Sequence, residues 1–124
     1  MVTVLVATAS VHTTAAACDY FDGRLGVDDS VVVLSVVDDT TDERDAGDAL
    51  NVAGARLPTA ETVRRAGDPA EEILAVAADS DADEILVGTR RGVPGTGTGL
   101  GNTAQRVVAG ADRPVVVLPC AAPA

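Results

Sequence analysis

Short apolar runs alternate with amphipathic segments along the chain. The apolar runs are rich in valine and are short enough for strands buried on both faces of a sheet. They predict strands over residues 1–7, 31–37, 84–88 and 114–119, and a weaker pattern adds residues 61–66. Apolar residues at helical spacing lie between these runs. They predict helices over 11–25 (ended by Gly26), about 45–57, from 69 to the turn at 80–83, and about 103–109.

The third predicted helix carries the strongest start signal. Asp68 fits the N-cap, Pro69 fits the first helical position, and Glu71 stands where a capping box places its acid. The alternation of strand and helix predicts one α/β domain over residues 1–124, with right-handed crossovers and a parallel sheet covered on both faces. Ligands of such sheets bind outside the carboxyl ends of the strands. We therefore look for a site in the loops after Ala7, Val37 and Gly88.

The charge balance excludes several function classes. The chain holds 19 acidic residues against nine basic ones, for a net charge of -10, and all nine bases are arginine. Without lysine there is no Walker A phosphate loop and no Schiff-base chemistry. An acidic surface repels nucleic acid and anionic membranes, so we expect neither as a partner. The composition also suggests a protein of a halophile, whose high salt screens carboxylate repulsion.

Other features narrow the expected setting and chemistry. No apolar run approaches the roughly 18 residues of a membrane span, and the start lacks a basic leader, so we expect a cytoplasmic protein. Cys18 and Cys120 have no metal-ligand spacing and are expected to be free thiols. His12 has no partner at motif spacing. We therefore predict no metal site and assign no catalytic residue.

A glycine-rich segment joins the strand at 84–88 to the last helix. Glycines stand at 88, 92, 95, 97, 99 and 101. Backbone N–H groups of such a loop, with the positive end of the following helix, can form an anion site, and Arg90 and Arg91 can add contacts to phosphate. A loop without a ligand has the same composition, so the two interpretations stay open at this point.

Nearly the whole chain resembles the universal stress protein family. The resemblance rests on VLVATAS, VVVLSVVDD, RRAGDPAEEILAVAADSDADEILVG and GNTAQRVVAGADRPVVVLP. It implies a Rossmann-like fold, an open five-stranded parallel sheet of order 3-2-1-4-5. Members commonly dimerise, often through the last strand, which here implies a homodimer through Val115–Leu118. The acidic face would then meet a basic protein partner.

Many members of that family bind ATP through the pattern G-x2-G-x9-G-[Ser/Thr]. Gly88 and Gly101 match the outer glycines, while Arg91 occupies the middle position and Gly92 follows it. Asn102 stands at the Ser/Thr position, and Thr103 comes next. An asparagine amide still donates hydrogen bonds to phosphate.

The nucleobase end also departs from the family pattern. Ala9 aligns with the Asp that ATP-binding members place near the ribose, and Thr8 precedes it. The resemblance implies that backbone at Val36 and Val87 supplies the remaining adenine contacts. Two functions follow from the family likeness. The first is a dimeric stress-response protein without catalysis and with an altered or lost ATP site. The alternative is an ATP-binding protein that uses the Gly88–Thr103 loop. An enzyme is a third class, but no catalytic signature is present.

Overall fold

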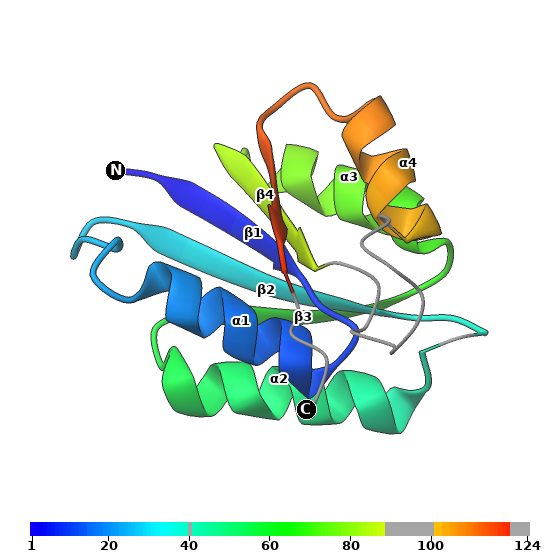
Figure 1. The fold of residues 1–124 in the computed structure, drawn as a ribbon, viewed down its shortest axis with the longest axis horizontal. Coiled ribbons are helices and arrows are strands. Elements are labelled where there is room, and N and C mark those ends of the chain that lie inside the picture. Colours follow the sequence, from blue (N-terminus) through cyan, green and yellow to red (C-terminus); the bar gives the residue numbers. More distant parts are fainter. Residues whose placement is uncertain (40, 89–100, 120–124) are drawn as a thin grey trace.

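Strands and helices alternate strictly in the computed structural model, which describes residues 1–39, 41–88 and 101–119. Figure 1 shows the sheet between two pairs of helices, with α1 and α2 on one face and α3 and α4 on the other. The elements in chain order are β1 (Thr3–Ala7), α1 (Val11–Phe21), β2 (Ser30–Val37), α2 (Glu43–Arg56), β3 (Glu61–Ala66), α3 (Pro69–Asp79), β4 (Glu84–Gly88), α4 (Asn102–Gly110) and β5 (Val115–Leu118).

The sheet has the predicted topology. Its five strands are parallel and lie in the order β3-β2-β1-β4-β5. The central strand β1 pairs with β2 on one side and β4 on the other, so that Ala7 lies opposite both Leu34 and Val87. The chain builds outward from β1 to β3 and then crosses back to β4. The reversal of strand order therefore falls between β1 and β4.

The core is built from small and branched aliphatic side chains. Valine and leucine side chains of the strands alternate between the two faces, as the pleat requires. On the α1 and α2 face, three alanines of α2 (Ala46, Ala49, Ala53) are fully buried. Phe21 of α1 contributes a buried aromatic side chain to the same face. On the other face, Ile73 and Val107 fill the space between α3, α4 and the sheet. Small side chains let the helices pack closely on a sheet with almost no aromatic residues.

Three of the four helices begin with a side-chain cap. The side chains of Ser10, Asp42 and Asp68 accept a hydrogen bond from the backbone N–H three residues on. The predicted start at Asp68 and Pro69 is thereby confirmed. Helix α4 begins instead at Asn102, after the N-cap residue Gly101, which has no side chain to accept a hydrogen bond.

Two helix boundaries differ from the prediction by more than one residue. Helix α1 ends at Phe21 and not at Leu25, because Gly23 takes a left-handed conformation (φ 74°) that turns the chain before Gly26. Helix α2 begins at Glu43, two residues earlier than predicted, because Asp42 caps it.

Cys18 and His12 lie on α1 in different surroundings. The Cys18 thiol is free and buried, and this burial raises its pKa, an effect that the nearby Arg56 partly opposes. His12 is exposed in the first turn. Cys120 lies outside the described residues. No helix in the described part of the chain has both the length and the apolar character to cross a membrane.

Candidate functional site

A cleft of about 510 Å³ opens at the carboxyl ends of β1, β2 and β4. It lies where the strand order reverses, which is the position predicted from the α/β pattern. Apolar side chains of Leu34, Val36, Ile73 and Val87 form part of its wall. Its remaining lining residues are Ala7, Thr8, Ala9, Thr13, Asp38, Thr41, Asp68, Pro69, Gly88, Gly101, Asn102, Thr103, Ala104 and Arg106.

The cleft gathers most of the residues that the sequence singled out. Eight of the ten predicted site residues line it, and they come from the ends of β1, β2 and β4 and from the start of α4: Thr8, Ala9, Val36, Val87, Gly88, Gly101, Asn102 and Thr103. The other two, Arg91 and Gly92, lie outside the described residues. The pairing of β1 with β4 explains the gathering, because it sets the start of the glycine-rich segment beside the end of the first strand.

The backbone of β2 reaches past the end of β1. The last link between the two strands is the hydrogen bond from the Thr8 N–H to the Leu34 carbonyl, 2.9 Å long. Residues two apart in a strand direct their backbone groups to the same side. Val36 therefore directs its N–H and C=O beyond the end of β1, toward the cleft that its side chain also lines.

Hydroxyl groups form hydrogen bonds among the residues at the base of the cleft. The Thr8 hydroxyl lies 2.9 Å from both the Ser10 carbonyl oxygen and the Thr14 hydroxyl. Ser35 donates to the Thr8 carbonyl at 2.7 Å, and Thr14 donates to the Ala49 carbonyl of α2 at 3.1 Å. The single hydroxyl proton of Thr8 is thus used within the protein. What Thr8 offers a ligand is a hydrogen-bond acceptor.

The first turn of α4 faces the cleft without a side-chain cap. Gly101, Asn102 and Thr103 all line the cleft, and the N-cap residue Gly101 is extended, with φ −66° and ψ 164°. The first N–H groups of any helix lack partners inside the helix, and the positive end of the helix dipole lies there. Such a start attracts an anion.

A bidentate ion pair joins α3 to α4 at the edge of the cleft. The Arg106 guanidinium donates to both carboxylate oxygens of Asp68, at 2.8 and 2.9 Å. The same carboxylate accepts from the Glu71 N–H at 2.9 Å. The pKa of Asp68 is lowered by the Arg106 hydrogen bonds first and by the Glu71 N–H second. Asp68 is therefore ionised at neutral pH.

Five polar lining residues escaped the sequence analysis as site residues: Thr13, Asp38, Thr41, Asp68 and Arg106. Asp38 and Thr41 follow the second strand directly, so the rule that ligands bind at carboxyl ends would have found them. They hold each other, because Asp38 accepts from the Thr41 N–H at 2.8 Å. Asp68 and Arg106 are 38 residues apart, and no spacing rule connects them. Within the described residues no three His, Cys, Asp or Glu side chains gather to hold a metal ion.

An open five-stranded parallel sheet with a cleft at its switch point defines an α/β fold of the Rossmann-like class. The sequence profile of the universal stress protein family matches residues 38–119, about two thirds of the chain. The chain belongs to the universal stress protein family. A comparison with curated proteins finds no match.

Solved structures share the fold over nearly the full chain. A hypothetical protein, PH0823, is 25% identical with a TM-score of 0.71, and the match covers 96% of this chain and 95% of that one. A universal stress protein in complex with cAMP is 18% identical (TM-score 0.68, covering 96% and 97%). An Arabidopsis thaliana family protein with AMP bound is 20% identical (TM-score 0.66, covering 96% and 92%).

Proposed function

We propose that this protein binds an adenine nucleotide in the cleft and acts in the stress response through that binding, without catalysis. Two proteins that share its fold are described with cAMP or AMP bound. The cleft volume, about 510 Å³, lies within the range of pockets for small molecules. The observation that carries the proposal is that the start of α4, which has no side-chain cap, and the carboxyl end of β2 line one cleft.

The adenine ring fits the β2 side of the cleft. A flat aromatic base needs apolar walls and a few polar groups at its edge. Val36 and Val87 provide apolar walls, and the backbone of Val36 provides an N–H and a C=O directed past the end of β1. Ala9, in place of an acid, leaves a methyl group where the ribose would otherwise meet a carboxylate. Thr8 can accept from a ribose hydroxyl, although a neutral acceptor binds more weakly than a charged one.

The phosphate fits the α4 side. The N–H groups of the first turn and the amide of Asn102 would hold phosphate oxygens. Arg91 and Gly92, at the middle of the family pattern, stay predictions because they lie outside the described residues.

We assign no catalytic role to the cleft. Asp38 accepts from the Thr41 N–H, and Asp68 is held by both Arg106 and the Glu71 N–H. A general base must be able to take a proton, and the lowered pKa of Asp68 gives its carboxylate a low affinity for one. Binding alone therefore accounts for the arrangement around Asp68.

Calorimetric titration with AMP, and with GMP as the matched control, tests the proposal. We expect AMP to bind and GMP to bind at least about tenfold more weakly, because the backbone edge at Val36 recognises the base. Equal affinity for the two nucleotides would refute adenine recognition. If millimolar AMP, cAMP and ATP produce neither heat nor a shift in melting temperature, nucleotide binding is refuted.

We also propose that two copies of the chain associate through β5. This strand lies at the edge of the sheet, with one side unpaired among the described strands, and three of its valines are half-buried (Val115, Val116, Val117). An edge of this kind pairs readily with another strand. Light scattering at micromolar protein in high salt tests it. A dimer that Val116→Lys converts to a monomer is expected, and a monomeric parent chain would contradict it.

A further inference from the structure

We propose that the Asp68–Arg106 pair makes the cleft select adenine ligands with a single phosphate group over ATP. This inference rests on the proposed nucleotide site and names the ligand class within it. Its basis is a pair of side chains on two helices that meet at the edge of the cleft.

The geometry of the pair commits both terminal nitrogens of Arg106 to Asp68. Two parallel hydrogen bonds of 2.8 and 2.9 Å join its guanidinium to the Asp68 carboxylate. Bidentate contacts of this kind are the strong form of the arginine–carboxylate interaction. The carboxylate is fixed from its other side by the Glu71 N–H. The only cation among the described lining residues is therefore neutralised by a carboxylate that is itself held in place.

The charges of the described lining residues disfavour several phosphates. The charged lining residues within the described part of the chain are Asp38, Asp68 and Arg106. Two carboxylates and one guanidinium leave a net charge of −1. Against this stands the start of α4, with about half a positive charge and its N–H groups. Among the described lining residues that supply suits one phosphate group, and Arg90 and Arg91 lie outside them. The additional phosphates of ATP would bring more negative charge into a cleft with two carboxylates.

The Asp68 carboxylate can be neutralised without removing the helix cap. Asparagine caps a helix about as well as aspartate, so Asp68→Asn keeps the bond to the Glu71 N–H and weakens the hold on Arg106. A freed guanidinium binds phosphate oxygens well. Asp68→Asn should therefore improve ATP binding much more than adenosine binding. Arg106→Gln should act in the opposite direction, because it leaves the Asp68 charge without its partner.

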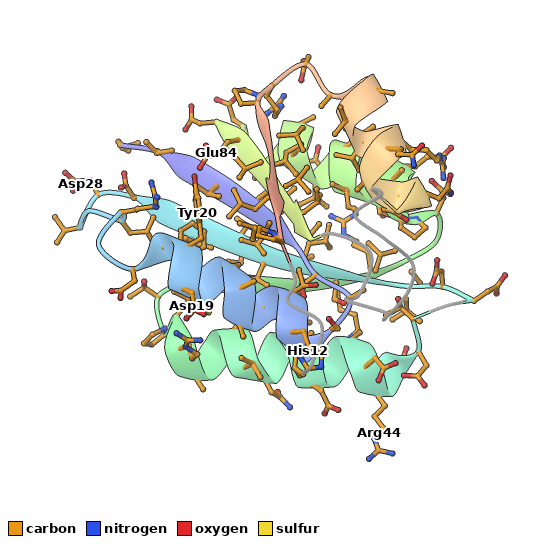
Figure 2. All side chains as sticks on the ribbon, viewed as in Figure 1. His12, Asp19, Tyr20, Asp28, Arg44 and Glu84 are labelled. Atoms are coloured by element: carbon orange, nitrogen blue, oxygen red, sulfur yellow. The ribbon has the colours of Figure 1, made fainter. Side chains whose placement is uncertain are left out.

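The experiment measures the affinities of adenosine, AMP, cAMP and ATP for the full chain in magnesium-free buffer. For the parent chain we expect AMP and cAMP to bind at least about tenfold more tightly than ATP. Asp68→Asn should reduce the preference for AMP over ATP by about tenfold, and Arg106→Gln should increase it. Asp19→Asn is the matched control, since it removes the same charge from an exposed ion pair with Arg56 (3.1 Å). Figure 2 shows Asp19 toward the far end of α1, away from α4.

The outcomes separate this inference from the proposed function. If adenosine, AMP, cAMP and ATP all fail to bind the parent chain, the proposed function itself is wrong. If AMP binds but ATP binds as well or better, the selectivity assigned here is overturned. The same holds if Asp68→Asn lowers the melting temperature without changing the AMP-to-ATP ratio, because a purely structural ion pair would behave in that way. A changed ratio in Asp68→Asn and an unchanged one in Asp19→Asn support the inference.

Discussion

Helices α3 and α4 both begin at the cleft, and they begin differently. At α3 the Asp68 side chain accepts from the Glu71 N–H, Pro69 fills the first helical position, and Arg106 holds the carboxylate. At α4 the N-cap is Gly101, which has no side chain to offer. Among the described residues, one helix start is thus held by side-chain contacts, and the other, which we call the open start, has no side-chain cap.

The difference separates what folding requires from what it does not. Every feature at the start of α3 stabilises the helix in a known way, so it needs no ligand to explain it. The start of α4 lacks the cap that the other three helices have, although a serine or an aspartate there would stabilise it. The φ of −66° at Gly101 is one that any residue adopts, so backbone conformation does not require glycine. A bound anion would explain the open start.

The largest expected effect comes from a substitution that caps α4 with a carboxylate. Gly101→Asp gives α4 the kind of cap that α3 has, and its carboxylate would occupy the N–H groups proposed for phosphate. We expect AMP affinity to fall by about tenfold or more, because the site loses donors and gains repulsion. Titration calorimetry measures it. The neutral isostere Gly101→Asn is the control and should lose less. Unchanged AMP affinity in Gly101→Asp would remove the role assigned to the start of α4.

The sequence predicted the topology of the sheet but not every helix boundary. Topology was predictable, because the buried strands read as continuous valine-rich runs and the family likeness implies the strand order. The end of α1 was not, because either Gly23 or Gly26 can turn a chain and only the tertiary fold selects Gly23. The start of α2 was missed because Asp42 lies within an acidic stretch, where several residues can act as the cap.

The lining of the cleft was predictable where it is made of residues at the end of a strand or at the family spacing. Gly88 and Gly101 follow from the family spacing, and Thr8 follows from its place after β1. The Asp68–Arg106 pair could not be predicted from the sequence, because the two residues meet only through the packing of α3 on α4. The internal use of the Thr8 hydroxyl was equally hidden, since its partner Thr14 belongs to the next helix.

The second largest expected effect comes from removing the side-chain cap of α3. Asp68→Ala removes the α3 cap together with the Arg106 contacts, and loss of a cap typically destabilises a domain of this size by a few degrees. We expect the melting temperature to fall by roughly 3–8 °C in circular dichroism melts at neutral pH. Asp42→Ala is the matched control, because it removes the cap of α2 from the Asp45 N–H. If both variants melt alike, the ion pair adds nothing to the cap.

The stability from Asp68 should depend on pH in a defined direction. The folded pKa of Asp68 lies below its unfolded value, owing first to Arg106 and then to the Glu71 N–H. Its contribution is therefore fully present above the unfolded pKa of about 3.9 and is lost as the pH falls through the lower folded value. The gap in melting temperature between the parent and Asp68→Ala should be constant near neutral pH and should shrink below about pH 4. A gap that widens in acid would contradict this sign.

The smallest expected effect is a change in the stability of the protein when the N-cap of α4 is replaced. Gly101→Asn supplies an amide oxygen that can accept from the first turn of α4. Replacing glycine by asparagine at an N-cap changes stability by only a few tenths of a kcal/mol, so we expect a gain of about 0.3 kcal/mol and a melting temperature about 1–2 °C higher. Asp68→Gly makes the reverse change at α3 and should lower the melting temperature by more, because it also releases Arg106. The two substitutions together test whether α4 is less stable than its sequence permits. If Gly101→Asn gains nothing, the first N–H groups of α4 are already satisfied within the protein, and the contrast with α3 reflects folding alone.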